Sequence, residues 1–143
     1  MAAPRTLAPA WSVRLAFELS ANDQTANALL AGLTDEQLNW QSAPGCWSVG
    51  QCLEHLCIAN ELYMLPISAA VKDKPDSPVE EITPGWFGRW FIRRFAEASP
   101  SSKRASAPAQ IRPAAHVDFS VLDRFLSGNK LCRELIKRSK ASN

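Results

Sequence analysis

Apolar residues recur at three- and four-residue steps along three long segments of the chain, a spacing typical of amphipathic helices. The segments cover about residues 9–33, 48–70 and 118–139. The residues that recur in this way form three helical stripes. They are Trp11, Leu15, Leu19, Ala26, Leu29, Leu30 and Leu33; Val49, Cys52, Leu53, Leu56, Asn60, Tyr63 and Ile67; and Leu122, Phe125, Leu126, Asn129, Cys132, Leu135 and Ile136. No stretch alternates as a β-strand does. The pattern therefore predicts a single all-α domain over residues 1–143.

Capping boxes mark the predicted helix starts, because a Ser or Thr caps the helix and the residue three positions on reaches back. Ser48 to Gln51 predicts the start of the second long helix, and Thr34 to Gln37 predicts a short helical turn before the break at Pro44-Gly45. Ser120 to Asp123 is a weaker box before the third helix. Pro66 is expected to kink the second helix or to end its regular part.

Two local expectations concern side chains outside the stripes. Trp40 and Trp47 bracket a short loop, and such large indoles are expected to anchor the loop on the core. Asn22, Asp23 and Gln24 interrupt the first stripe, so we expect them on a water-facing side of that helix.

Residues 72–117 contain six prolines with clustered Ser, Ala and Lys, which predicts a long crossover, partly without regular structure. Within it, residues 86–95 combine aromatic residues with arginines in a pattern compatible with a short helix. We expect the aromatic side chains to pack on the bundle as a lid while the arginines reach water. A membrane-surface helix and a partner-docking surface are the alternatives.

The composition of the chain limits the classes of partner that we expect. A net charge of +2 gives no reason to expect nucleic acid or a membrane, and no apolar run reaches the roughly 20 residues that span a bilayer. The N-terminus lacks the features of a secretory signal, so we expect a cytoplasmic protein. Its four cysteines form no C-x-x-C pair and are expected to be reduced, mostly buried thiols.

His55 is the first candidate for chemistry, at the edge of the apolar stripe of the second helix and on the same side as Cys52. It is either a metal ligand or general base, or a histidine satisfied by one hydrogen bond at the core edge. Glu54 and Glu61 point away from it and are expected on a solvated face. His116 is expected in a loop, reaching His55 only if the crossover folds back over the bundle.

Several of these residues together resemble the front half of DinB-like proteins. They are Leu38-Asn39-Trp40, the stretch from Pro44 to Leu56 with its Trp-Ser-aliphatic helix start and His-Leu pair, then Asn60 and Tyr63. The resemblance implies an up-down four-helix bundle with a long crossover between helices two and three. It also implies a divalent metal, zinc or nickel, held by three histidines. Members include metal-dependent thiol S-transferases, in which the metal lowers the pKa of a bound water or thiol.

Only His55 matches a ligand of that family. The other two histidines belong to an H-x-x-x-H pair on a fourth helix, for which this sequence has no counterpart before Asn143. We therefore expect an incomplete DinB-like domain, resembling a thiol S-transferase or hydrolase but inactive alone. Either the reading frame is truncated or split, or a homodimer or another partner chain supplies the helix.

Two further hypotheses stay open at this point. One is a non-enzymatic interaction or oligomerisation module whose open helical groove binds a partner helix. The other is a complete metal site in which Cys52 and His116 join His55.

Overall fold

The computed structural model describes residues 8–72, 83–96 and 106–141, and within these ranges it contains helices and no strand. The elements are α1 (Ala10–Leu30), α2 (Asp35–Leu38), α3 (Val49–Lys72), α4 (Trp86–Ala96), the 3-10 turn η1 (Ala109–Ile111) and α5 (Ser120–Ala141). The all-α prediction is confirmed. The parts of the predicted crossover at 73–82 and 97–105 lie outside the described residues.

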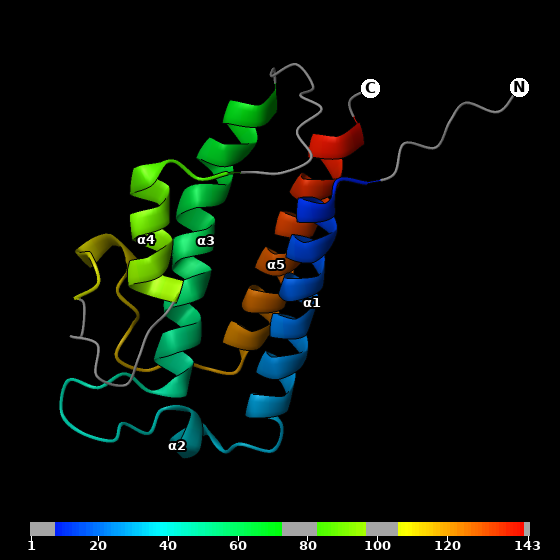
Figure 1. Cartoon of the computed structure of the whole chain (residues 1–143). Helices are drawn as coiled ribbons and strands as arrows, with labels where there is room; N and C mark the ends of the chain where they lie inside the picture. Colours follow the sequence, from blue (N-terminus) through cyan, green and yellow to red (C-terminus); the bar gives the residue numbers. More distant parts are fainter. Residues whose placement is uncertain (1–7, 73–82, 97–105, 142–143) are drawn as a thin grey trace, which may run out of the picture.

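The three long helices form the body of the molecule (Figure 1). α5 packs against both α1 and α3, whereas α1 and α3 have no comparable contact with each other. α4 lies at the edge of the view, beyond α3 (Figure 1). The bundle is therefore a three-helix arrangement with α5 in the middle, and the short helix predicted within residues 86–95 is present.

Local signals explain most helix boundaries. The boxes at Thr34 and Ser48 both form: Gln37 and Gln51 each donate a backbone N–H to the capping hydroxyl and accept one from the capping residue. The box expected at Ser120 is wrong, because the Asp118 carboxylate accepts the Ser120 N–H at 2.7 Å instead. Hydrogen bonds from the Ser120 hydroxyl and, second, from its N–H hold the pKa of Asp118 below its usual value.

Pro66 does not end α3, which continues to Lys72, so that part of the expectation is wrong. A proline removes one backbone donor and crowds the preceding turn.

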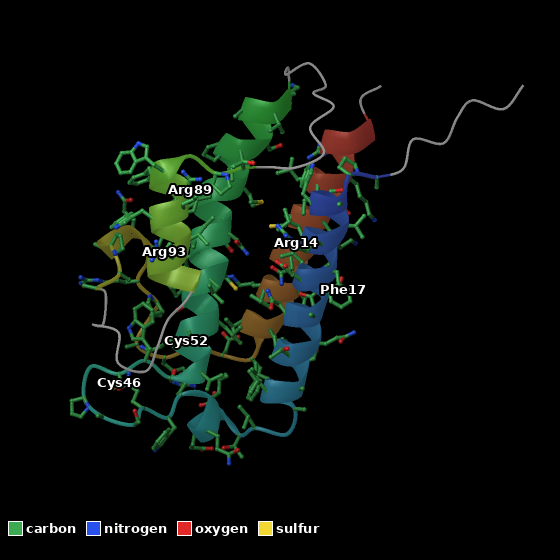
Figure 2. All side chains as sticks on the ribbon, viewed as in Figure 1. Arg14, Phe17, Cys46, Cys52, Arg89 and Arg93 are labelled. Atoms are coloured by element: carbon green, nitrogen blue, oxygen red, sulfur yellow. The ribbon has the colours of Figure 1, made fainter. Side chains whose placement is uncertain are left out.

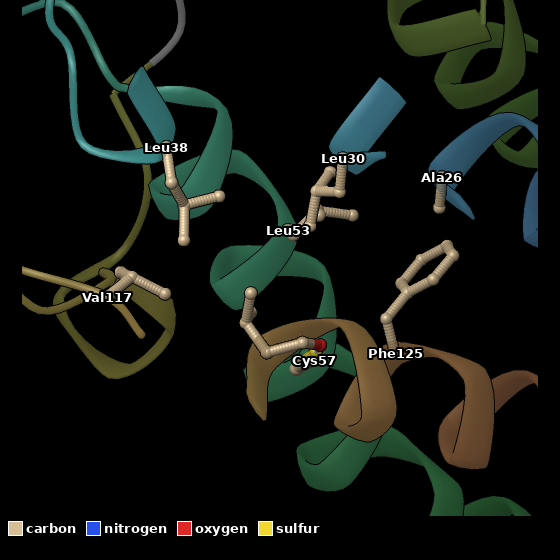
Figure 3. Packing of buried hydrophobic residues seen from close by; sticks show 8 residues of the cluster. Ala26, Leu30, Leu38, Leu53, Cys57, Val117 and Phe125 are labelled. Atoms are coloured by element: carbon tan, nitrogen blue, oxygen red, sulfur yellow. Dashed lines mark hydrogen bonds between the residues drawn. The ribbon is translucent and has the colours of Figure 1, made fainter. Parts of the chain in front are cut away.

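The buried apolar residues gather at one end of the bundle, where α1 ends and α3 and α5 begin (Figure 3). They are Ala26, Leu30, Leu38, Leu53, Cys57, Val117, Val121 and Phe125. We call this the closed end. α3 has no buried residue after Cys57 among those described, and large apolar side chains toward the other end, the open end, face solvent. They include Val13, Phe17, Leu62, Tyr63, Leu65, Ile67, Val71 and Leu131.

A polar cluster joins α1 to α5 beyond that core. The Asp23 carboxylate accepts a hydrogen bond from the buried Asn129 amide at 2.7 Å and pairs with Arg133 at 2.6 Å. Both charged side chains are largely buried. The expectation that Asp23 faces water is therefore wrong, because α5 supplies two donors opposite it.

Replacing Asp23 is expected to be far more costly than replacing Glu18, the other paired carboxylate of α1. Asp23→Ala leaves Asn129 and Arg133 without their acceptor and should lower the free energy of unfolding by about 2–4 kcal/mol. Glu18→Ala removes an exposed pair with Arg14 and should change it by less than about 0.5 kcal/mol. Urea unfolding of both variants measures the difference, and equal effects would contradict the buried pairing.

Candidate functional site

His55 lies in the second turn of α3, half-buried at the closed end. Its Nδ1 is 2.7 Å from the carbonyl oxygen of Ile111, and its ring lies against the Trp47 indole with centroids 5.0 Å apart. A carbonyl only accepts, so Nδ1 of the neutral ring carries the proton and Nε2 keeps its lone pair. The structure thus shows a histidine satisfied by one hydrogen bond at the core edge, with the other nitrogen left as an acceptor.

The Ile111 carbonyl belongs to a segment, residues 109–117, that we call the return segment. Other polar side chains hold its backbone in the same way. Ala114 donates its N–H to the Glu54 carboxylate at 2.6 Å and accepts from the Gln51 amide at 2.9 Å. Asn39 accepts the Val117 N–H at 2.8 Å and donates to the Val117 carbonyl at 2.9 Å. Side chains of α3 and of the residue after α2 therefore fasten the end of the crossover beside His55.

Sequence reasoning missed the part that Asn39 and Gln51 play in this contact. The sequence shows only that both residues have amide side chains. The structure adds that Gln51 is buried and that Asn39 is half-buried next to the fully buried Leu38. A polar side chain at such a position needs hydrogen-bond partners. A segment of bare backbone is one source of them.

Glu54 is not on a solvated face, which corrects the expectation. Its side chain is only 15% exposed, because it caps the Ala114 N–H and lies 3.5 Å from the Arg124 guanidinium of α5. Glu61 is exposed as expected, and it also pairs with Arg124, at 3.0 Å. The hydrogen bonds that Arg124 donates to the Glu61 carboxylate are the main reason that the pKa of Arg124 is raised.

The hypothesis that Cys52 and His116 join His55 in a metal site is wrong. The crossover does fold back to His55, but it presents the Ile111 carbonyl, while His116 lies in a loop with its Nε2 3.5 Å from the Asp35 carboxylate. Desolvation raises the pKa of the Cys52 thiol, which disfavours the thiolate that binds metals. In the described part of the chain, no three His, Cys, Asp or Glu side chains are grouped to hold a metal ion. Alone, these residues supply one suitable imidazole and do not form a metal centre.

An open pocket of about 880 Å³ lies next to His55. Trp47 connects the two, because it lines the pocket and its indole contacts the His55 ring. Its other lining residues are Ser42, Gly45, Cys46, Cys52, Ser106, Ala107, Arg112 and Pro113. Figure 2 shows Cys46 and Cys52 on this side, near the start of α3. The pocket combines an indole, a guanidinium and two thiols, a lining suited to a small molecule with apolar and anionic parts.

Two expectations about this region need correction. Trp40 does not anchor its loop on the core, because it is 67% exposed, whereas Trp47 does pack, on His55. Of the cysteines, which were expected mostly to be buried, Cys57 is fully buried and Cys52 is exposed. The burial of Cys57 raises the pKa of its thiol, so it behaves as a small apolar core residue.

Comparison with known proteins gives a family and a relative. A family model described as the DinB superfamily matches residues 18–125. An uncharacterised protein of Bacillus subtilis (strain 168), YuaE, is 27% identical over 106 residues, which is 74% of this chain and 54% of the relative. The chain thus spans about half the length of the curated relative that it matches. No solved structure gives a significant match.

The two histidines should differ in tautomer. At a pH where both rings are neutral, His55 is expected to carry its proton on Nδ1, which faces a carbonyl, and His116 on Nε2, which faces a carboxylate. Long-range ¹H–¹⁵N correlation spectra of the imidazoles distinguish these forms. A proton on Nε2 of His55 would contradict the contact with Ile111.

Proposed function

The chain belongs to the DinB superfamily, and from that premise we propose that it is the His55-bearing part of a metal-dependent thiol S-transferase or hydrolase, inactive by itself. His55 contributes one ligand for zinc or nickel. The remaining ligands come from a fourth helix outside the described residues, in the same polypeptide or in a partner chain.

The tautomer of His55 is the observation that carries this proposal. Metal-binding histidines commonly donate their second ring N–H to a carbonyl or carboxylate, which orients the ring and leaves the other nitrogen for the metal. The hydrogen bond of Nδ1 with the Ile111 carbonyl has that form. The Trp47 indole restrains the same ring from another side.

The packing of the long helices is consistent with a fourth helix in the complete bundle. α1 and α3 both pack on α5 but not appreciably on each other, so a fourth helix has a position between them. A pocket with two thiols and Arg112 beside Trp47 supports a small thiol or anionic substrate.

Metal titration tests the proposal. The chain alone is expected to bind Zn²⁺ or Ni²⁺ without a stoichiometric endpoint, because one imidazole is a weak site. The chain extended by a helix with two histidines four residues apart is expected to bind one ion, as measured by calorimetry. His55→Ala should abolish that binding, and His116→Ala should preserve it.

Two results would contradict the assignment of His55. One is stoichiometric binding by the unextended chain that survives His55→Ala. The other is binding by the extended chain that is insensitive to the same substitution.

A second candidate function is an interaction or oligomerisation module whose open groove accepts a helix from a partner or a second copy. The exposure of the open end favours it: Phe17 on α1 and Leu65 on α3 are 73% and 78% exposed. Such side chains in contiguous patches are typical of interaction surfaces.

Sedimentation equilibrium tests this candidate. If the open end self-associates, Leu65→Glu should shift the chain to monomer. Trp40→Glu changes a residue that is also largely exposed (67% against 78%) but lies at the closed end, and it should leave the association unchanged. A monomer at all concentrations, or equal effects of the two variants, counts against self-association.

A further inference from the structure

α4 carries a dense set of exposed large apolar side chains for its length of 11 residues. Trp86, Phe87, Trp90, Phe91 and Ile92 are between 50% and 78% exposed, and α4 makes only marginal contact with the other described elements. The expectation that these aromatic side chains pack on the bundle as a lid is therefore wrong. The closed end is already filled by side chains of α1, α3 and α5. Apolar side chains of the open end stay exposed as well, and α4 makes only marginal contact with the helices that carry them.

The residues of α4 form ridges along the helix. Residues four apart are neighbours on a helix surface, so Trp86 with Trp90 and Phe87 with Phe91 make two adjacent aromatic ridges. The ring centroid of Phe87 lies 6.0 Å from that of Trp86 and 5.7 Å from that of Trp90. By the same spacing Arg89 and Arg93 form a third ridge, on the side of the tryptophans away from the phenylalanines. Figure 2 labels both arginines on α4.

The charge of α4 has one sign, because its sequence contains arginines and no Asp or Glu. The expectation that the protein has no membrane partner came from the net charge of +2 of the whole chain. That average does not reflect the local concentration of positive charge on α4. Basic residues beside exposed aromatic rings attract anionic lipid surfaces.

We propose that α4 docks the protein on the surface of an anionic lipid bilayer. Trp86, Trp90, Phe87 and Phe91 enter the headgroup region, where indoles are enriched. Arg89 and Arg93 extend along the surface to lipid phosphates, since arginine stems reach past apolar neighbours to place the charge. The association is peripheral: no helix in the described ranges is long and apolar enough to cross a membrane.

The breadth of the apolar surface favours a bilayer over a protein groove. A helix bound in a groove presents one narrow stripe of anchors. On α4 the tryptophan and phenylalanine ridges lie side by side, and Ile92 adds apolar surface further around the helix. A flat, yielding surface covers such a wide face better than a fixed groove.

Vesicle flotation tests the proposal with the whole chain. Binding is expected to vesicles of phosphatidylcholine with about one-third phosphatidylserine and not to phosphatidylcholine alone, and to weaken with salt. Trp86→Ser with Trp90→Ser, or Arg89→Glu with Arg93→Glu, should reduce the affinity about tenfold or more. Because these side chains are exposed, the variants should keep the helical circular dichroism of the parent.

Matched controls come from α1, on the other side of the view from α4 (Figure 2). Phe17→Ser and Arg14→Glu remove an exposed ring and an exposed charge there and should leave binding unchanged. The proposal is overturned if anionic vesicles do not float the chain, or if the α1 and α4 variants lose binding equally. It is also overturned if the α4 variants change only the sedimentation of the protein, which would assign α4 to a protein contact.

Discussion

The structure depends on hydrogen bonds between polar side chains and the backbone of the return segment. This segment has no regular structure of its own beyond the turn η1, and its N–H and C=O groups need partners wherever water is excluded. Asn39, Gln51, Glu54 and His55 supply them. Through these contacts the crossover is joined to the start of α3, and Val117 enters the core beside Leu38. The first turns of α5 follow directly from that position.

The same contacts determine what kind of site the closed end offers. His55 is oriented by a carbonyl and an indole, and the neighbouring pocket is walled by residues of the return segment and of the loop before α3. Leu53 and Cys57 of the same helix belong to the buried core, so a packed part of the molecule supports the ring. Support by packing is what a ligand or a binding group requires. The open end provides no such support, which separates the protein into a preorganised half and an apolar, uncovered half.

Local sequence signals predicted much of the secondary structure, but contacts between residues far apart in the sequence could not be predicted. Capping boxes and apolar periodicity involve residues within a few positions of one another, so the starts of α2 and α3 could be predicted. The partners of Asp23 and Glu54 lie on α5, far away in sequence. The hydrogen-bond partner of His55 is a backbone carbonyl, which leaves no mark in the residue types. The exposure of α4 could not be foreseen either, because an amphipathic pattern does not say what covers its apolar face.

The way the return segment is held also affects how the sequence can drift. Its contacts with Asn39, Gln51, Glu54 and His55 use the main-chain atoms of Ile111, Ala114 and Val117, and main-chain atoms are common to nearly all residue types. Substitutions at the exposed Ala114 leave these hydrogen bonds intact, with proline as the exception because it has no N–H. The partner side chains have no such freedom. Evolutionary variation should therefore accumulate at the exposed positions of the return segment and be restricted at the four side chains that hold it.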